Sequence, residues 1–418
     1  MKRRTFTKFI EESKSFDLIE EGGGAGHLSN VFDIDGFTFD DIKDIIKNSL
    51  SGKINLATEK TDGQNIMISW INDELRFARN KGHLRDFGER SMNIGELKSK
   101  FAGRGGLTVA WDAMAEDLTT AFRQVNTRDL NDIFDNGRHW MSLEILHPES
   151  ENLVHYGADF FRLQFHGTRE VDESGNTMSE DKQAAIKLEK ILKDLHLDRQ
   201  KTYTITGPHI IELKKSLNFK DQIKDITSNL DKFMDKYNMK NSNTIKDFKE
   251  NVILKEMPKI NDSYVEEGML QRWLGNGGLQ LRELKKRVDA DLYNELAMFD
   301  KEVPKLLKKH VLELEKIIIK LGSQVLKNVT NFLAVNKDKS KQAIRKRIED
   351  TITMIKDGGD KKHMDKLQLE LERLNSAGGL DSIIPSEGIV FFHKGEMLKF
   401  TGAFAPANQL FGLRFQME

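Results

Sequence analysis

Residues 58–65 read Thr-Glu-Lys-Thr-Asp-Gly-Gln-Asn, and residues 66–70 read Ile-Met-Ile-Ser-Trp. The second run alternates apolar and polar residues in part and predicts a strand. Asp-Gly is typical of a tight turn that glycine permits, so we expect a hairpin that holds the Lys60 amine at the mouth of a sheet. Burial or cationic neighbours can lower the pKa of a lysine and free its amine for nucleophilic attack. An incidental lysine on a surface turn is the alternative interpretation.

The composition limits the class of protein. The chain has 418 residues, with 38% hydrophobic and 31% charged residues and a net charge of -1, which predicts a soluble protein whose basic surface, if any, is local. It has no cysteine, so disulfides and cysteine metal sites are excluded. No apolar run reaches the ~18 residues of a membrane span, and the basic N-terminus lacks the apolar core of a signal peptide. We therefore expect a cytoplasmic protein with no membrane partner.

Strand patterns occur in two separated parts of the chain. They cover residues 54–56, 66–68, 75–78, 140–146 and 160–167, and return at 388–392 and 396–402. Residues 172–382 are rich in Lys, Glu, Asp and Leu at helical spacing, with Thr177 and Glu180 expected to cap the first helix. The simplest explanation is an α+β fold in which one β-rich domain is split by a large all-helical insertion.

The predicted domain organisation has four parts. We expect N-terminal helices and a glycine-rich linker over 1–52, the first part of the β domain over 53–170, the helical insertion over 171–383, and the last strands over 384–418. The linker glycines at 22–26 lack the Gly-Lys-Ser/Thr of a phosphate loop, so we do not interpret them as a nucleotide site.

Several charged residues stand within or at the ends of the predicted strands. Burying an unpaired charge is costly, so such residues need partners or a ligand. Cations hold phosphates, and carboxylates hold Mg²⁺. Charges gathered on one face of a sheet would therefore suit a nucleoside triphosphate with a divalent metal, and an aromatic ring could stack on the base. The charged candidates are Lys60, Asp62, Arg79, Glu144, Glu387 and Lys399.

The order of these residues resembles the covalent nucleotidyltransferase superfamily, which comprises ATP-dependent ligases and mRNA capping enzymes. Lys60 to Gly63 match the nucleophile motif Lys-x-Asp-Gly, and Glu387 to Val390 match the motif Glu-Gly-hydrophobic-Val. The remaining matches are Arg79, Glu144 in Ser-Leu-Glu-Ile, the aromatic Phe165 or alternatively Phe161, and Lys399 in Leu-Lys-Phe. The resemblance covers residues 50–170 and 384–405 and implies an antiparallel-sheet, ATP-grasp-like ligase domain.

The resemblance also implies roles. Lys60 would attack the α-phosphate of ATP to form lysyl-AMP, with Mg²⁺ or Mn²⁺ as the metal. Arg79 and Lys399 would neutralise phosphate charge, Glu144 would hold the ribose or the metal, Glu387 would hold the metal, and Phe165 would stack on the purine. The Asp62-Gly63 pair belongs to the nucleotide-binding motif. Glu59, which precedes the nucleophile, would accept a hydrogen bond from the adenine amino group, as in some RNA ligases.

The chain departs from DNA ligases and capping enzymes after the last motif. Only residues 401–418 follow it, so we expect no C-terminal OB barrel, and this favours the RNA ligase branch. The expected function is an ATP-dependent RNA ligase-like adenylyltransferase that joins 5′-phosphate to 3′-hydroxyl ends. The alternatives are a nick-sealing DNA ligase, a capping-type guanylyltransferase, and a ligase-like fold with a purely structural or binding role.

Two further expectations concern partners and source. The helical insertion could clamp nucleic acid, bind a protein partner or only rigidify the domain. Lys305, Lys308 and Lys309 stand on one predicted helix and Arg345 and Arg347 on the next, interleaved with carboxylates, so a solvated surface is the alternative to phosphate binding. The N-terminal stretch resembles those of tailed-phage proteins, which would place the protein in the host cytoplasm.

Overall fold

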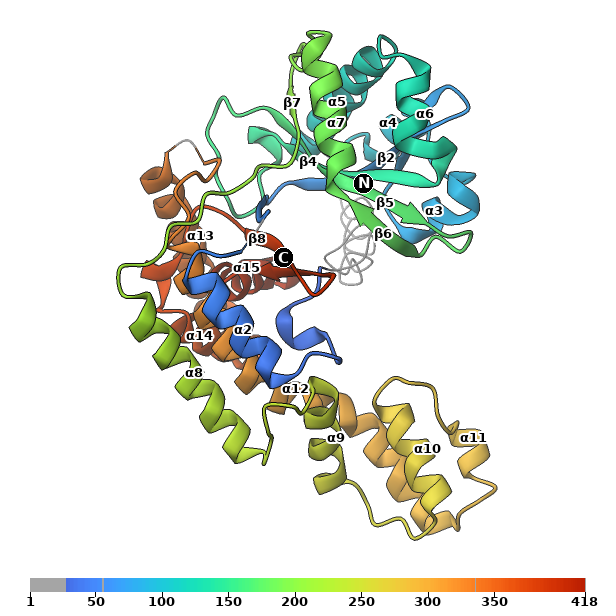
Figure 1. Ribbon diagram of the computed structural model, residues 1–418, viewed down its shortest axis with the longest axis vertical. Coiled ribbons are helices and arrows are strands. Elements are labelled where there is room, and N and C mark those ends of the chain that lie inside the picture. The colour runs from blue at the N-terminus through green and yellow to red at the C-terminus, as the bar shows by residue number, and fades with distance from the viewer. Residues whose placement is uncertain (1–27, 55, 335, 418) are drawn as a thin grey trace.

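The protein is an α+β molecule with two antiparallel sheets and a large helical part (Figure 1). The computed structural model describes residues 28–54, 56–334 and 336–417. The expected helix and glycine-rich linker before residue 28 lie outside these ranges. Among the described residues, none of the helices combines the length and the apolar character needed to cross a bilayer.

The larger sheet has the strand order β3-β2-β4-β5-β6, and β7 adds to β5 in parallel. Its first hairpin turns at Asn72 and Asp73, both with positive φ, as a two-residue turn of this hand requires. The strands are β2 (Gln64–Ile71), β3 (Glu74–Ala78), β4 (His139–Leu146), β5 (Arg162–Val171), β6 (Thr177–Asp181) and β7 (Thr204–Thr206).

Helices cover one face of the larger sheet and bury a continuous apolar core. This core contains Trp111, Phe122, Phe134 and Tyr203 with the inward side chains of β2, β4 and β5. Its helices are α4 (Ile94–Phe101), α5 (Gly106–Phe122), α6 (Thr127–Phe134) and α7 (Lys182–Asp194), while α3 (Lys81–Gly88) follows β3.

The smaller sheet joins distant parts of the chain. Its order is β1 (Thr58–Lys60), β8 (Gly388–His393) and β9 (Glu396–Phe400), with Lys60 opposite Gly388 and Val390 opposite Lys399. The predicted return of the C-terminal strands to the N-terminal part is therefore confirmed in the pairing of β1 with β8. The strands form two sheets rather than one, and β1 passes from the smaller sheet into β2 of the larger sheet.

Two predictions about the start of the helical region are wrong. β6 and β7 pair with β5, so the larger sheet continues past the expected boundary at residue 170. Thr177 and Glu180 lie in β6 rather than at a helix start, and the N-cap of α7 is Asp181, whose side chain accepts from the Gln183 amide. The expected strand at 54–56 is also absent, since Ile54 and Leu56 are in no strand and residue 55 is not described.

The helical part carries three further cores. One joins α2 (Phe39–Leu50) to α8 (Phe219–Lys236), to the C-terminal half of α12 (Ala290–Leu326) and to β8 and β9. A second packs α13 (Lys337–Gly358) and α14 (Lys361–Ser376) against α15 (Phe404–Leu413). The third forms a distal lobe of α9 (Ile245–Glu256), α10 (Ser263–Trp273), α11 (Leu281–Leu284) and the start of α12, seen at the lower right of Figure 1.

Candidate functional site

Lys60 is the last residue of β1, and it meets Glu387, the residue before β8. Its Nζ forms an ion pair and a hydrogen bond with Glu387 Oε1, although 327 positions separate the two residues in the chain. Burial lowers the pKa of the Lys60 amine, but the charges of Glu387 and Glu144 outweigh burial and raise it overall. In this arrangement Lys60 is a charged ammonium group, so it must lose a proton before it can act as a nucleophile.

Gly388 is required where β8 starts beside Lys60. Its φ is +151°, and a Cβ atom there would lie 2.1 Å from the Phe400 carbonyl oxygen of β9. A side chain at this position would therefore push β8 away from β9. This close approach of the two strands explains why glycine follows Glu387.

Gly63 serves a different purpose from the expected tight turn. Its φ is not positive, and a Cβ atom would lie 2.6 Å from the Ile145 carbonyl oxygen of β4. β1 and β2 belong to different sheets, so the expected hairpin at Asp62-Gly63 is wrong. The glycine is needed because the backbone of β4 lies directly against the crossing between the sheets.

Asp62 fixes this crossing to the loop after β4. Its Oδ2 accepts hydrogen bonds from the amides of Leu153 and Val154 at 2.8 and 2.7 Å, and its own amide donates to the Tyr156 hydroxyl at 2.7 Å. Burial and the charge of Glu387 raise the pKa of Asp62 to about 7, against the opposing effect of Lys60 and these amides. The carboxylate thus holds the backbone beside Lys60 in place.

Glu144 of β4 lies on the site side of the larger sheet. Its Oε2 lies 3.0 Å from His166 Nε2 and accepts a hydrogen bond from the Thr61 hydroxyl at 3.3 Å. Thr61 follows Lys60 directly, and the Glu144 charge acts on the Lys60 pKa. Glu144 is therefore brought to the same site as Lys60 and Glu387.

Phe165 of β5 lies on the face of the larger sheet opposite to Glu144 of β4 and His166 of β5. Its ring is 0% exposed and packs in the apolar core with Leu143 and Leu163. The prediction that Phe165 stacks on a base is wrong for this conformation, because side chains alternate between the two faces of a strand. Phe161, the alternative, packs against the same core.

His166 is the ring that β5 presents to the site, and the motif comparison missed it. Its side chain is 25% exposed. The signal was present in the sequence, since Arg162, Gln164 and His166 alternate with Leu163 and Phe165 over the predicted strand. The alternation places the imidazole with the polar set and the phenylalanine with the core.

Glu59 is enclosed rather than open to a ligand. Only 1% of the residue is exposed, and its Oε2 accepts from the Leu333 amide at 2.9 Å in the segment between α12 and α13. Burial raises the pKa of Glu59 to about 7. A base could reach this carboxylate only after the segment around Leu333 moved away.

Arg79 and Lys399 occupy two sides of the site. Arg79 donates to the Asn65 carbonyl oxygen and lies over the Trp111 ring, 5.2 Å from its centre. Burial lowers the Arg79 pKa, while Glu144 opposes this, so the guanidinium lies near the Glu144 side. Lys399 shares a face of the smaller sheet with Val390 and Thr58, which stand at successive paired positions.

Lys182 is a further cation that sequence reasoning did not select. It starts α7, and its Nζ donates to the Thr58 hydroxyl at 3.1 Å and lies 5.0 Å from the centre of the Phe392 ring. Burial lowers the Lys182 pKa to about 8, and Glu180 opposes this. Lys182 therefore brings α7 of the larger sheet against β1 and β8 of the smaller one.

The carboxylates of the site fit a metal only in part. Among the described residues, no group of three or more His, Asp or Glu side chains is arranged to hold an ion. Mg²⁺ in nucleotide sites takes one or two carboxylates and completes its shell with phosphate oxygens and water. Glu144 and Glu387, on either side of Lys60, would supply the two carboxylates of such a site.

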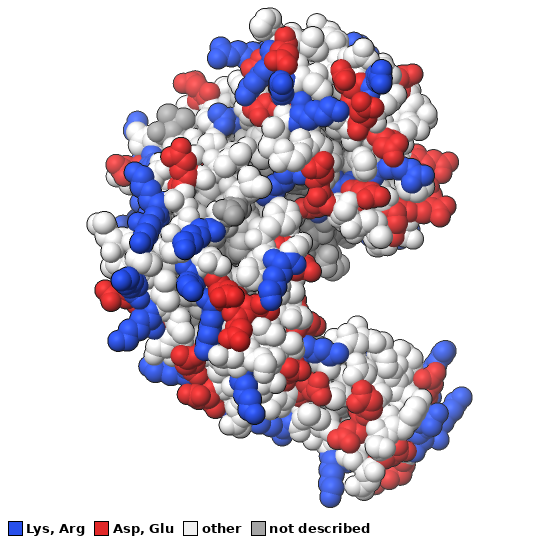
Figure 2. Space-filling model, viewed as in Figure 1, with Lys and Arg blue, Asp and Glu red and all other residues white. Residues whose placement is uncertain are grey.

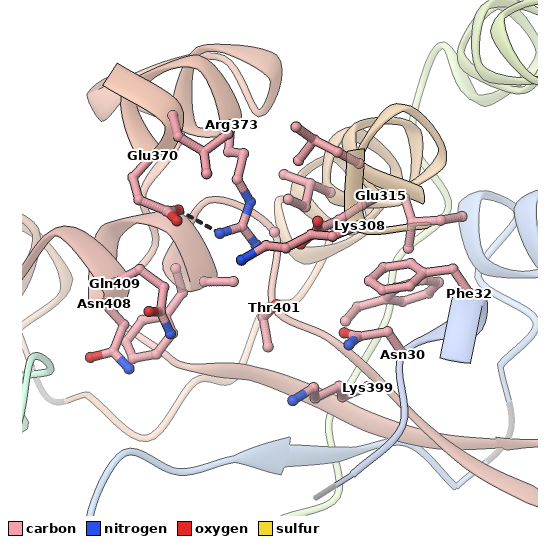
Figure 3. A pocket seen from close by; sticks show the side chains of 18 of the residues that line it. Asn30, Phe32, Lys308, Glu315, Glu370, Arg373, Lys399, Thr401, Asn408 and Gln409 are labelled. Atoms are coloured by element: carbon pink, nitrogen blue, oxygen red, sulfur yellow. Dashed lines mark hydrogen bonds and ion pairs between the residues drawn. The ribbon is translucent and has the colours of Figure 1, made fainter. Parts of the chain in front are cut away.

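A cavity of about 640 Å³ opens beyond Glu387 and Lys399. Figure 3 shows side chains from β9, α12, α14 and α15 pointing into it. Its charged lining residues are Lys305, Lys308, Lys309, Glu315, Glu370, Arg373, Glu387 and Lys399.

The chain has no match among protein-family models, curated proteins or solved structures. The resemblance to the covalent nucleotidyltransferases therefore rests on the sequence motifs alone.

Proposed function

We propose that this protein is an ATP-dependent, RNA ligase-like adenylyltransferase that forms lysyl-AMP at Lys60. The observation that carries the proposal is the meeting of Lys60 with Glu387 across 327 positions of the chain. Glu144 acts on the same amine, and Lys399 stands on the strand paired with β8. A lone lysine on a surface turn would not need two carboxylates from separate sheets around it.

The first step is a displacement at the α-phosphorus of ATP. The Lys60 Nζ forms a bond to this phosphorus, the bond to the β-phosphate oxygen breaks, pyrophosphate leaves, and the ammonium gives up its protons to solvent or a nearby base. Lys399 and Arg79 would meet the negative charge on the phosphate oxygens. Mg²⁺ or Mn²⁺, held by Glu144 and Glu387 with phosphate oxygens, would supply further charge neutralisation.

In this step the negative charges of Glu387 and Glu144 must be neutralised, because they stabilise the protonated form of Lys60. Glu387 raises the pKa of the amine, whereas burial alone lowers it. A metal ion held by Glu387 and Glu144 would weaken the attraction of these carboxylates for the ammonium, which would lower the pKa of Lys60 toward the neutral amine. The ion pair therefore keeps Lys60 unreactive until nucleotide and metal are both present.

The later steps transfer AMP to an RNA end. An oxygen of a 5′-phosphate attacks the phosphorus of lysyl-AMP, the phosphorus–nitrogen bond breaks, and Lys60 regains its protons. A 3′-hydroxyl then attacks the activated 5′-phosphate and releases AMP. These steps follow from the family resemblance, and the choice of RNA over nicked DNA belongs to the same proposal.

The test is self-labelling. The protein is incubated with Mg²⁺ and ATP or GTP labelled at the α-phosphate, and a denaturing gel is run. A covalent label is expected with ATP and not with GTP, and none in Lys60→Arg, which keeps the charge and the pairing with Glu387 but lacks the nucleophilic amine. Lys394→Arg, in the exposed turn after β8, is the matched control and should label normally.

Two outcomes would contradict the proposal. Equal labelling of wild type and Lys60→Arg would exclude Lys60 as the nucleophile, and no label with either nucleotide would exclude adenylyl transfer. Addition of 5′-phosphorylated RNA or nicked DNA to the labelled protein then identifies the acceptor that removes the label.

A further inference from the structure

The cavity beyond Glu387 shares this residue with the Lys60 site. Glu387 pairs with Lys60 and also lines the cavity, as does Lys399. Figure 3 shows Lys399 and Asn30 on one side and Lys308 of α12 near Arg373 of α14 on the other. A group bound in the cavity would therefore stand next to the counter-ion of the proposed nucleophile.

The lysines of the cavity stand on one face of α12. Three lysines follow the spacing that aligns side chains on a helix, since Lys308 and Lys309 lie three and four positions after Lys305. The same face continues with Leu312 and Glu315. Like charges at this spacing repel each other. Neither Lys308 nor Lys309 forms an ion pair within the described part of the chain, although Glu370 lies close enough to Lys308 for its charge to act on that lysine.

The cavity has more positive than negative groups. Five cations and three carboxylates line it. Glu315 and Glu370 both pair with Arg373, and Glu387 pairs with Lys60, which is not itself part of the lining. The carboxylates thus pair with Arg373 and Lys60, and Lys305 pairs with Glu302, whereas Lys308 and Lys309 form no ion pair among the described residues. Amide side chains from Asn408 and Gln409 of α15 add hydrogen-bonding groups.

The in-line geometry of displacement at phosphorus explains why a phosphate site in this cavity would be useful. When Lys60 attacks, the leaving group on the α-phosphorus is pyrophosphate, and when lysyl-AMP reacts, the attacking group is a terminal 5′-phosphate. Attacking and leaving groups lie roughly in line through phosphorus. Pyrophosphate in the first step and the 5′-phosphate in the second therefore occupy the same position, across the phosphorus from Lys60. One cationic site beside Lys60 can therefore serve both steps.

We propose that the cavity formed by α12, α14, α15 and β9 is a phosphate site for the group exchanged with Lys60. Its ligand is a pyrophosphate or a terminal 5′-phosphate, bound chiefly by Lys308, Lys309 and Lys399. This inference rests on the proposed function for the identity of the exchanged group. It assigns to the helical insertion a direct part in the reaction.

The experiment measures phosphate binding without turnover. All proteins carry Lys60→Arg, so no AMP is taken up. The double variant Lys308→Ala/Lys309→Ala is compared with Lys285→Ala/Lys286→Ala, which removes the same charge from exposed positions after α11 in the distal lobe. Equal melting temperatures and circular dichroism spectra establish that each variant is folded.

Two ligands distinguish the sources of phosphate. Pyrophosphate is titrated by calorimetry, and a single-stranded RNA is titrated with either a 5′-phosphate or a 5′-hydroxyl end. We expect Lys308→Ala/Lys309→Ala to weaken pyrophosphate binding, or the preference for the 5′-phosphate end, by about tenfold or more. The distal double variant should change either by no more than about twofold.

The outcome that would overturn the phosphate site is unchanged binding of both ligands in the α12 double variant. Loss of the pyrophosphate response assigns the site to the triphosphate, and loss of end discrimination assigns it to the acceptor. Failure of the proposed function is separate. A protein that binds pyrophosphate through Lys308 and Lys309, yet is never labelled by ATP when Lys60 is intact, keeps the site and loses the adenylyltransferase assignment.

Discussion

The two sheets of this molecule differ in the charged residues that they bury. The larger sheet presents Phe165, Leu143 and Leu163 to a core of large apolar side chains. The smaller sheet also packs apolar residues such as Phe391 and Phe400 in a core. At β1 and just after it, however, Glu59 and Asp62 are buried and Lys60 is partly exposed. Buried charges cost free energy unless they are paired, so these groups contribute little to the stability of the smaller sheet. Both sheets therefore supply apolar core, and under the proposed function the smaller sheet would also carry the nucleophile.

The surface charge outside these sheets does not by itself indicate a binding site. Figure 2 shows Lys and Arg side chains mixed with Asp and Glu over the visible face of the helical part. Such mixing is typical of a solvated helix surface. The concentration of lysines on one face of α12, within a cavity, is therefore more specific than the lysine content of the insertion as a whole.

The largest expected effect contrasts two phenylalanines, one from each sheet. Phe165→Ala opens a cavity in the apolar core and should lower the free energy of unfolding by about 3–5 kcal/mol. Phe392→Ala of β8, whose side chain is 40% exposed, should cost about 1 kcal/mol or less. Urea denaturation of both variants measures the difference. Equal losses would contradict the burial of Phe165 and the exposure of Phe392 in the structure.

The next effect concerns the buried carboxylate beside Lys60. Burial raises the pKa of Glu59 from 4.5 to about 7, so the folded state holds a proton that the unfolded state releases between these pH values. The stability of the wild type should therefore fall as pH rises from about 4.5 to 7, by about 2–3 kcal/mol from this group. Glu59→Gln should lose this part of the fall and be the more stable protein at pH 8.

Asp62 and an exposed carboxylate provide the controls for that measurement. Burial also raises the pKa of Asp62 to about 7, so a part of the pH dependence should remain in Glu59→Gln. Glu74→Gln, at an exposed position of β3, should leave the wild-type profile unchanged. A Glu59→Gln profile identical to that of the wild type would contradict the pKa assigned to Glu59.

The smallest effect tests which ring of β5 faces a nucleotide. His166→Ala should weaken ATP binding about tenfold, because base stacking on an aromatic ring contributes about 1–3 kcal/mol. His166→Phe should retain most of the affinity, since it keeps a ring while it loses the contact with Glu144. Titration of a fluorescent ATP analogue in the Lys60→Arg background measures both. Equal affinity of His166→Ala and the wild type would remove His166 from the site.

The sequence predicted the long-range plan better than the local detail. Strand patterns at 66–68, 75–78, 140–146 and 388–392 were enough to predict β2, β3, β4 and β8, and the charged residues within them indicated that Lys60 and Glu387 would meet. Thr38 and Asp41 form the capping box of α2, and their spacing in the sequence is the one that such a cap requires.

The errors have physical causes in tertiary structure. Thr177 and Glu180 have the spacing of a helix cap, but pairing with β5 holds them in β6. The Asp62-Gly63 pair has the composition of a turn, but the approach of β4 rather than a turn requires the glycine. Phe165 was selected by its distance along the chain from other motifs, and such counting does not register which face of a strand a residue occupies.

The most direct test of the central claim is the position of AMP on the protein. Wild-type protein is incubated with ATP and Mg²⁺, digested, and analysed by peptide mass mapping under conditions that preserve the phosphorus–nitrogen bond. We predict AMP on Lys60 alone, with Lys182, which contacts β1, and Lys399 of β9 unmodified. AMP on Lys182 or Lys399, or on no lysine at all, would contradict the assignment of Lys60 as the nucleophile.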